Sequence, residues 1–443
     1  MKIVLEIFLF MGIFFPVYHI FNSFIPNKKR YIPKNNKKVS ILIPCYNEGK
    51  ILQTTIDGIN RIEYPKFEVI FVNDGSLDNT LFVLKDVLKL RKTKRKKYHN
   101  LNSKSILGIY KSELYPNIIV IDKENGGKSD ALNMGINYSK YDYIVTLDAD
   151  SVLKVNALSK IMDKFNDHSV IAASGVIQIM QSFNLSKIND STTLKINTLL
   201  KLQTLEYIKA CFSYKSSLSK LKSLLVISGA FGCFTKDLLL QVNGFKHVIG
   251  EDLDITIRIQ LLIKNTNYKI AYCPDAICYT EGPETFKDYI KQRKRWQHSF
   301  IEGLVNYYKF IYKDTFRNAL SFFTLFDFII IGYLSSLLVI FFSIIIIYNI
   351  TSNNPFIVLS YFLIFMFINL IYDLTSIIIA NNHGIKYKKI DFFRLIYTVF
   401  LDIFFYRYVT LYTVILGSLT YLKEHKSWNK VERSGRNYNA LSE

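Results

Sequence analysis

The sequence has few cysteines, and their spacing excludes two common uses. Only five of its 443 residues are cysteine, and no Cys-x-x-Cys pair occurs among them. An odd number of cysteines without that spacing indicates neither a disulfide framework nor a zinc site. We therefore expect reduced thiols, which are usual on the cytosolic side of a membrane.

Acidic residues are also scarce relative to basic ones. The chain has 36 Asp and Glu residues against 56 Lys and Arg residues, which gives a net charge of +20. Such a balance is typical of proteins that bind nucleic acid, anionic lipid or phosphorylated substrates. Because 50% of the residues are hydrophobic and several apolar runs are long, we expect membrane lipids and phosphorylated substrates as partners and no nucleic acid.

The N-terminal apolar run lacks the small-x-small cleavage site of a signal peptide. Residues 3–25 are nearly all apolar and long enough to span a bilayer, and Glu6 lies near their start. The run ends at Lys28-Lys29-Arg30, and basic residues at the end of a span mark its cytoplasmic side. This pattern predicts a transmembrane helix over residues 1–26, with a cytoplasmic segment after it.

Short apolar runs alternate with helical patterns from residue 37 to about residue 280. This alternation predicts parallel β-strands joined by helices. Ligands of such sheets lie at the carboxyl ends of the strands, and here those places are polar or rich in glycine. The predicted strands are Val39–Ile43, Phe67–Val72, Ile118–Ile121 and Tyr143–Leu147, and the residues that follow them include Asn47, Asp74, Lys128 and Asp148.

Asp148 and Asp150 stand one residue apart directly after the last of these strands. Two carboxylates so placed suit a hard divalent cation that also contacts a phosphate. As an isolated pair they could equally be ordinary solvated acids. The polar turns after the neighbouring strands favour the metal site.

Two later segments combine residue types that suggest function. Small residues around Ser228 and Gly229 would allow a ligand or another backbone to come close, or would form a tightly packed strand. Glu251, Asp252 and Asp254 open a predicted helix. Acids in a first turn commonly complement the helix dipole, but these could instead supply a general base.

Two basic segments are candidates for contact with the membrane surface. Residues 281–315 are amphipathic and aromatic, as is typical of an interfacial helix. Alternatively, the guanidinium groups of Arg293 and Arg295 could bind a pyrophosphate bidentately, with Trp296 stacked on a sugar. The basic run from Arg91 to Lys97 predicts a solvated loop, or a contact with anionic lipid.

The C-terminal part contains further long apolar runs. Residues 319–350 and 355–380 can each cross a bilayer, and Asp327 and Asp373 are the only charged residues within them. Such acids are candidates for function, although hydrogen bonds within a helix bundle would also explain them. Residues 390–422 form one span, an interfacial helix plus a span, or a re-entrant pair. Residues 423–443 have the charge of a cytosolic tail.

In this order, the motifs resemble those of the membrane-integrated family 2 glycosyltransferases, which include cellulose, hyaluronan, chitin and poly-N-acetylglucosamine synthases. The resemblance extends over essentially the whole chain and is greatest to the bacterial poly-N-acetylglucosamine synthases. It is carried by Val39–Pro44 with Tyr46-Asn47-Glu48, Val72–Ser76, Gly126-Gly127-Lys128 with Ala131-Leu132-Asn133, Asp148-Ala149-Asp150, Glu251-Asp252 and Gln292-Arg293-Lys294-Arg295-Trp296.

The resemblance implies roles for these residues in sugar transfer from a UDP-sugar. Asp252 corresponds to the general base, with Glu251 beside it, although Gly250 stands where the family has Thr. Gln297-His298-Ser299 also departs from the family pattern, on the acceptor side. The implied donor-binding residues are Pro44, Tyr46, Asn47, Glu48, Asp74, Lys128, Asp148, Arg293 and Arg295; the acceptor-binding residues are Gln292, Trp296, Ser228 and Gly229; and Asp148 and Asp150 would hold Mg²⁺ or Mn²⁺.

The resemblance also implies an architecture and an activity. We expect a Rossmann-like α/β catalytic domain of the GT-A type over residues 37–280, an interfacial segment over 281–315 and transmembrane helices over 319–422. The expected protein is a multi-pass enzyme of the bacterial inner membrane with a cytoplasmic catalytic domain. It would extend a β-linked polysaccharide similar to poly-N-acetylglucosamine and export it, with an accessory export subunit as a further partner. The alternatives are single transfer to a lipid-linked acceptor, or an inactive subunit that binds nucleotide sugars.

Overall fold

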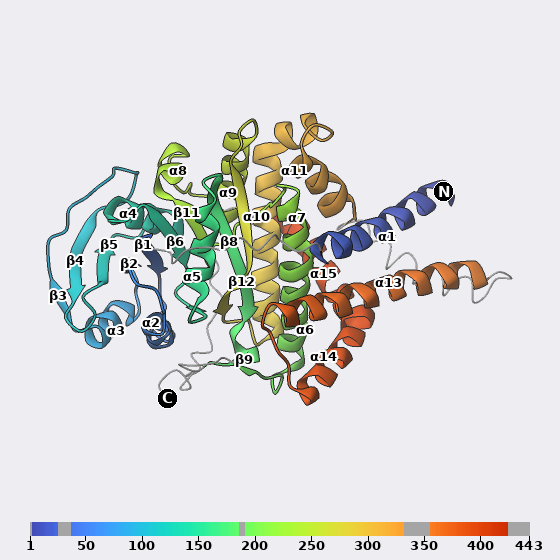
Figure 1. Ribbon diagram of the computed structural model, residues 1–443, viewed down its shortest axis with the longest axis horizontal. Helices are drawn as coiled ribbons and strands as arrows, with labels where there is room; N and C mark the ends of the chain where they lie inside the picture. The colour runs from blue at the N-terminus through green and yellow to red at the C-terminus, as the bar shows by residue number, and fades with distance from the viewer. Residues whose placement is uncertain (1, 25–36, 186–190, 332–354, 424–443) are drawn as a thin grey trace. The chain divides into compact units, whose positions relative to one another are not determined.

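The computed structural model describes residues 2–24, 37–185, 191–331 and 355–423 (Figure 1). Within these ranges the chain forms two compact units. The α/β unit contains the described residues of 37–191 and 226–283, and the helical unit contains those of 2–24, 192–225 and 284–423. Residues 192–225, which we expected within the α/β domain, thus belong to the helical unit. The basic run at residues 28–30, most of the apolar run over 319–350, and the tail beyond residue 423 lie outside the described residues.

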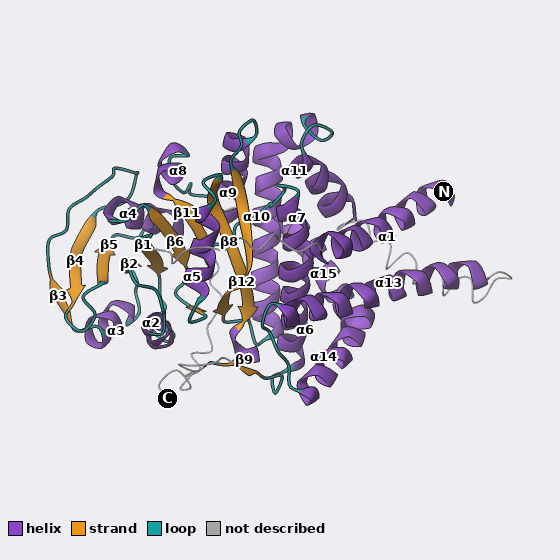
Figure 2. Ribbon diagram, in the orientation of Figure 1, coloured by secondary structure: helices purple, strands orange, loops and turns teal. Residues whose placement is uncertain are grey.

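A mixed β-sheet forms the core of the α/β unit, and its described strands follow the order β3-β4-β5-β2-β1-β6-β11-β8-β12-β7 (Figure 2). The strands predicted from the sequence form its parallel part, and their Val, Ile and Leu side chains are almost all buried, as expected for strands covered on both faces. These strands are β1 (Val39–Cys45), β2 (Phe67–Asp74), β5 (Ile118–Lys123) and β6 (Tyr143–Leu147).

The rest of the sheet differs from the wholly parallel arrangement that the sequence pattern predicts. Antiparallel pairing occurs on both sides of the parallel strands, so the sheet is mixed. On one side, β11 (Phe231–Thr235) is antiparallel to β6 and to β8 (Val170–Ile179), and β12 (Lys269–Thr280) is parallel to β8 and antiparallel to β7 (Ser151–Leu153). On the other side, β4 (Ile106–Ser112) is antiparallel to β5 and to β3 (Leu90–Lys92).

The basic run after the second predicted helix is more ordered than a solvated loop. Its first residues, Arg91 and Lys92, lie in β3. Arg95 forms an ion pair with Glu68 at 2.5 Å and donates from Nε to the carbonyl oxygen of Tyr138 at 2.8 Å. Part of this positive charge therefore stabilises the fold of the α/β unit.

Helices pack against the sheet and position the loops at its carboxyl edge. Helix α4 packs against β1 and β2, and Gly135 lies at this contact, where a Cβ would be 3.0 Å from the Leu42 side chain. The helices of this unit are α2 (Leu52–Asn60), α3 (Thr80–Val87), α4 (Lys128–Tyr138), α5 (Ala157–Met162), α8 (Lys236–Gln241) and α9 (Glu251–Ile263), with 3₁₀ turns η1 (Asp163–Asn166) and η2 (Met180–Ser182). A separate pair joins β9 (Phe183–Asn184) to β10 (Ser191–Thr192).

The described part of the helical unit is built from long helices joined by π-helical turns. Among the described residues, the continuous helix Lys389–Tyr421 is long and apolar enough to cross a membrane, judged by length and composition. The elements are α1 (Lys2–Phe24), α6 (Thr198–Ile208), α7 (Ser216–Lys220), α10 (Phe286–Lys313), α11 (Ala319–Phe322), α13 (Pro355–Asn382), α14 (Lys389–Leu401) and α15 (Arg407–Tyr421), with π-helical η3 (Lys209–Lys215), η4 (Phe323–Ile331) and η5 (Asp402–Tyr406).

The acids of the apolar runs are paired within this unit. Asp327 accepts a hydrogen bond from Nε2 of His19 at 2.9 Å. Asp373 lies 3.4 Å from the Nζ of Lys209, which also forms a 2.6 Å ion pair with Asp402. These contacts support the simpler of the two interpretations, in which the acids are held by polar partners inside the bundle.

All five cysteines are free thiols and all are buried. Burial raises the pKa of Cys278, and the nearby carboxylates of Asp148 and Asp150 raise it further. Burial likewise raises the pKa of Cys233. Thiols with raised pKa values remain protonated and unreactive at neutral pH, which agrees with the reduced state expected from the sequence.

Candidate donor and catalytic site

Predicted site residues from four segments meet at the carboxyl edge of the sheet. Asp148 directly follows β6, and Lys128 is the first residue of α4. The Nζ of Lys128 lies 2.7 Å from Oδ1 of Asp148 and 2.8 Å from Oε1 of Glu251, which opens α9. One lysine thus connects the Asp-x-Asp motif to the acids expected to include the general base.

The loop before β11 completes this cluster. The backbone N–H of Gly229 points to Oδ2 of Asp252 at 3.4 Å. A Cβ at Gly229 would lie 3.2 Å from the Nζ of Lys128 and 3.3 Å from Oε1 of Glu251, so a side chain there would crowd the ion pair. The strand β11 starts only at Phe231, so the tightly packed strand that was one alternative for this segment does not include Ser228 and Gly229. Ser228 and Gly229 therefore lie in a loop, where their backbone can approach the site.

The cluster shifts the ionisation of its members in different directions. Burial raises the pKa of Asp252, the adjacent negative charge of Glu251 raises it further, and Lys128 opposes both. Burial alone would lower the pKa of Lys128, but Asp148 and Glu251 outweigh that effect and raise it. Lys128 is therefore a permanent cation, whereas Asp252 is a carboxylate with increased basicity, as a general base requires.

The third acid of the α9 first turn has a different role. Asp254 is buried and forms an ion pair with Arg258 one turn later, with 2.7 Å between Oδ2 and NH2. Arg258 also donates to the carbonyl oxygen of Gly244 at 2.9 Å. Asp254 thus fixes the loop before α9, while Glu251 and Asp252 belong to the cluster.

Asp74, the last residue of β2, is enclosed by donors. Its Oδ1 accepts from the backbone N–H of Gly126 at 3.0 Å, and its Oδ2 accepts from that of Gly127 at 2.7 Å. The Nζ of Lys123, whose side chain is 0% exposed, lies 2.5 Å from Asp74 and 2.6 Å from Asp130. Asp74 therefore holds the glycine loop in place, which in turn positions Lys128. Gly127 has φ = 86°, a conformation that favours glycine.

The loop after β1 is tied to the loop after β2. Oδ1 of Asn47 accepts from the backbone N–H of Leu77 at 2.8 Å. The backbone N–H of Glu48 donates to Oγ1 of Thr80 at 2.8 Å, and Pro44 pairs in register with Val72. The residues Pro44, Tyr46, Asn47 and Glu48, predicted to form the floor of a donor pocket, thus lie beside Asp74 at the same edge of the sheet.

The Asp-x-Asp residues fit a divalent cation that a substrate also coordinates. Asp148 is partly exposed, whereas Asp150 is buried and its Oδ1 accepts from Oγ of Ser151 at 3.1 Å and from Oγ1 of Thr280 at 3.3 Å. No group of three or more His, Cys, Asp or Glu side chains arranged to hold a metal occurs in the described part of the chain. This donor set fits Mg²⁺ or Mn²⁺, because such ions commonly take one or two carboxylates and complete their shell with water and phosphate oxygens.

The remaining predicted residues lie on α10 in the helical unit. Gln292 and Arg293 are buried, Arg295 is half-buried and Trp296 is 40% exposed. The residues after the motif, where the sequence departs from the family pattern, contact α15. Nε2 of Gln297 donates to Ser418 at 3.2 Å, and Nε2 of His298 lies 3.0 Å from Oγ1 of Thr420. A Cβ at Gly417 would lie 2.7 Å from the Gln297 side chain, so glycine permits this close packing.

Two parts of these networks were not among the predicted site residues. Lys123 was missed because the predicted third strand ends at Ile121, although a lysine so close to a strand end is a visible signal. Glu206 pairs with Arg293, which is 87 residues away in the sequence. No local pattern marks that pairing.

The architecture agrees with a solved protein structure. The mannosyltransferase PcManGT from Pyrobaculum calidifontis, solved in complex with GDP-Man and Mn²⁺, superposes with a TM-score of 0.54 at 15% identity. The match covers 96% of this chain and 98% of that one. Similarity at this identity supports the fold alone, and it confirms the GT-A-type α/β domain expected for the catalytic part, although its sheet is mixed and not wholly parallel.

Family comparisons then identify the protein's class more narrowly. Residues 40–225 match the family described as Glycosyl transferase family 2, and residues 143–373 match the Glycosyl transferase family group 2. The second match spans more than half of the chain. This chain therefore belongs to the family 2 group of glycosyltransferases.

Among curated proteins, the chain is similar to poly-β-1,6-N-acetyl-D-glucosamine synthases. It is 30% identical over 307 residues to the synthase of Staphylococcus epidermidis, and the match covers 67% of this chain and 64% of that protein. It is 29% identical over 313 residues to the Staphylococcus aureus (strain COL) synthase, and this match covers 67% of this chain and 65% of that protein. The chain thus matches slightly less than two thirds of the length of these relatives.

Proposed function

We propose that this protein is an inverting glycosyltransferase that transfers a sugar from a UDP-sugar to a growing β-linked polysaccharide. The observation that carries the proposal is the cluster of Asp148, Lys128, Glu251 and Asp252 at the carboxyl edge of the sheet. It combines acids for a metal, a cation for a diphosphate, and a carboxylate of raised pKa for proton transfer. Membership of the glycosyltransferase family supports the same chemistry.

The donor nucleotide would bind over the loops that follow β1, β2 and β5. Pro44, Tyr46, Asn47 and Glu48 would line the pocket, and Asp74 would accept a hydrogen bond from the uracil. Lys128 would pair with the diphosphate, for which it would leave its present partners. Asp148 and Asp150 would hold Mg²⁺ or Mn²⁺, which would supply a positive charge beside the leaving group. The Mn²⁺ in the PcManGT complex supports a metal in this fold.

Asp252 would act as the general base. It would take the proton of an acceptor hydroxyl as that oxygen attacks the anomeric carbon and the bond to the UDP oxygen breaks. A single displacement inverts the anomeric centre, so an α-linked donor yields a β-linked product. Glu251 would keep Asp252 basic through its negative charge, and the N–H of Gly229 would orient the carboxylate.

Acceptor binding is assigned to a second group of residues. Trp296 would stack on the acceptor sugar, and Gln292, Ser228 and Gly229 are the other residues proposed for acceptor binding. Of the two arginines that the resemblance implies at the pyrophosphate, Arg295 would keep that role. The 40% exposed indole of Trp296 supports the stacking role, because an exposed aromatic ring can cover the apolar face of a sugar.

The favoured product is a polymer similar to poly-N-acetylglucosamine, which the transmembrane helices would export from the cytoplasmic catalytic domain across the inner membrane. The similarity to poly-β-1,6-N-acetyl-D-glucosamine synthases supports this polymer. The apolar helix Lys389–Tyr421 supports a membrane location. An accessory export subunit is the expected protein partner.

The test is synthesis by the purified protein in nanodiscs with a panel of labelled UDP-sugars. We expect UDP release and a long polymer with one donor, UDP-N-acetylglucosamine, and loss of both when EDTA removes the metal. Transfer of one sugar to an extractable lipid would favour the lipid-linked acceptor. No UDP release from any donor, together with retained UDP binding, would favour a binding subunit and overturn the proposal.

A further inference from the structure

The Gln292–Trp296 motif places its two arginines on different sides of α10. Successive helical residues are rotated by about 100°, so Arg293 and Arg295 point about 200° apart. Side chains two positions apart on a helix do not face each other. Arg293 instead shares a face with Tyr289, four residues before it, and with Trp296, three residues after it. One diphosphate could therefore not be clamped by both arginines in the way that the sequence suggests.

The guanidinium group of Arg293 lies over both of these aromatic rings. Its guanidinium carbon lies 4.8 Å from the ring centre of Tyr289 and 4.4 Å from that of Trp296. Both distances are within the range of about 6 Å in which a cation is attracted to an aromatic ring. The Arg293 side chain is 9% exposed, and its Nε and NH2 atoms are buried. In this arrangement these two donors are therefore not exposed to a diphosphate in solvent.

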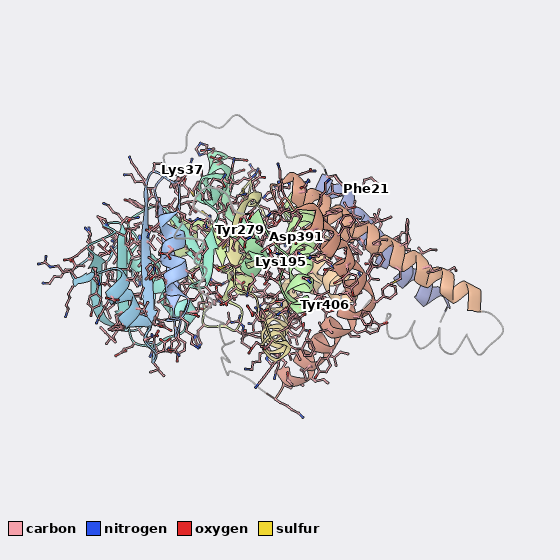
Figure 3. The ribbon with its side chains drawn as sticks, turned by 90° about the horizontal axis from the view of Figure 1, so that it is seen from below. Phe21, Lys37, Lys195, Tyr279, Asp391 and Tyr406 are labelled. Atoms are coloured by element: carbon pink, nitrogen blue, oxygen red, sulfur yellow. The ribbon has the colours of Figure 1, made fainter. Side chains whose placement is uncertain are left out.

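A carboxylate from another helix fixes the guanidinium in this position. NH1 of Arg293 donates to Oε1 of Glu206 on α6. The second oxygen of Glu206 accepts from the hydroxyl of Tyr406 in η5 at 2.8 Å; Tyr406 is labelled in Figure 3. The resulting network of Tyr406, Glu206, Arg293 and Trp296 joins α6, α10 and η5 through an ion pair, a hydrogen bond and a cation–aromatic contact. All four residues belong to the helical unit.

Trp296 differs from the tyrosines around this network because it is accessible to solvent. It is 40% exposed, whereas Tyr289 and Tyr406 are buried. The ring of Tyr207 lies beside it, with 6.5 Å between ring centres. An exposed indole on a solvated helix has several rotamers, so stacking on a fixed guanidinium would reduce its freedom before a ligand binds.

We propose that Arg293 is a positioning residue that holds Trp296 in the orientation that receives the acceptor glycan, and that it is not a ligand of the donor diphosphate. The contact with a glycan rests on the proposed function, whereas the fixing of the indole does not. A planar guanidinium can stack on a ring while its edge binds Glu206. A lysine at this position retains the charge but not the plane.

The first experiment measures the orientation of Trp296 directly. The chain has two tryptophans, Trp296 and Trp428, so a Trp428→Phe background makes emission report on Trp296. We expect Arg293→Lys and Glu206→Gln to increase acrylamide quenching of this emission about twofold or more, given the energy of a cation–aromatic contact. Lys287→Ala, which removes an exposed charge from the same helix, is the matched control and should leave quenching unchanged.

The second experiment separates acceptor handling from donor binding. In nanodiscs, Arg293→Lys should raise the KM for an oligosaccharide acceptor about threefold to tenfold, while the Kd for UDP stays within about twofold of the wild type. Arg295→Lys should instead raise the Kd for UDP and leave the KM for the acceptor near the wild-type value. Glu206→Gln should change the KM for the acceptor and the Kd for UDP in the same way as Arg293→Lys. It therefore tests the same contact if the Arg293→Lys protein folds poorly.

Two results would overturn the inference. One is unchanged quenching in both Arg293→Lys and Glu206→Gln. The other is a loss of UDP affinity in Arg293→Lys as large as that in Arg295→Lys. If the wild-type protein transfers no sugar from any UDP-sugar, the proposed function fails, but the quenching of Trp296 still decides whether Arg293 positions the indole.

Discussion

Charged residues are arranged differently in the two units of this chain. In the α/β unit, Lys128, Asp148 and Asp252 gather at the carboxyl edge of the sheet and are only partly buried. In the helical unit, Lys209 with Asp402 and His19 with Asp327 are enclosed between helices. Both groups pair basic side chains with aspartates, but only the first group remains accessible to a ligand.

This difference separates charges that a ligand could reach from charges that hold helices together. A partly exposed ion pair can exchange its partner for a substrate at little cost, because water replaces the lost contact. A buried ion pair cannot, since removing one partner leaves an unsolvated charge. We therefore expect substitutions in the first group to affect turnover, and substitutions in the second group to affect stability.

The largest expected effect is on turnover and comes from the proposed base. Asp252→Asn should reduce kcat by a factor of about 10² to 10⁴, the usual contribution of general base catalysis, while the Kd for UDP stays near the wild-type value. Asp254→Asn serves as the contrast, because its effect should appear in thermal stability through the lost Arg258 pair. Equal turnover of Asp252→Asn and the wild type would remove Asp252 from the mechanism.

The next effect concerns the metal. Asp150→Asn should raise the Mn²⁺ or Mg²⁺ concentration needed for half-maximal UDP release by about tenfold to a hundredfold, because one of the two proposed carboxylate ligands loses its charge. Metal titrations of the UDP release rate would measure it. Full activity in EDTA would contradict a metal role for Asp148 and Asp150.

In the helical unit, Lys209→Met should cost about 3–5 kcal/mol of stability, because Asp373 and Asp402 lose their shared buried cation. Thermal unfolding in nanodiscs would measure the loss. Lys195→Met, which removes an exposed lysine of the same unit (Figure 3), is the control and should change little. Equal stabilities of the two variants would show that the buried charges are not needed for folding.

The smallest effect is a shift in pH dependence. Asp252 works as a base only when deprotonated, so activity falls as pH drops through its raised pKa. Glu251 helps to raise that pKa, so Glu251→Gln should lower it and extend activity to lower pH. The acid limb of kcat/KM would report the shift. A limb that moves to higher pH in Glu251→Gln would contradict the proposed electrostatic coupling.

The gathering of these residues at one edge of the sheet could be predicted because its signals are local. A short apolar run followed by Asp or Gly marks the end of a strand, and parallel strands bring their ends to one edge. Asp74, Lys128 and Asp148 were identified in this way. The position of Gly229 beside Lys128 could not be predicted, since it depends on antiparallel pairing of β11 with β6.

The sequence by itself determined the four parallel strands, the apolar helices and the residues at the strand ends, because hydrophobic period and turn chemistry depend on neighbours along the chain. Only the tertiary structure decided which charges pair. Asp74 holds the glycine loop through backbone N–H groups, and Arg293 is bound to Glu206 from another helix. Such contacts depend on distances between segments far apart in the chain, which no local pattern encodes.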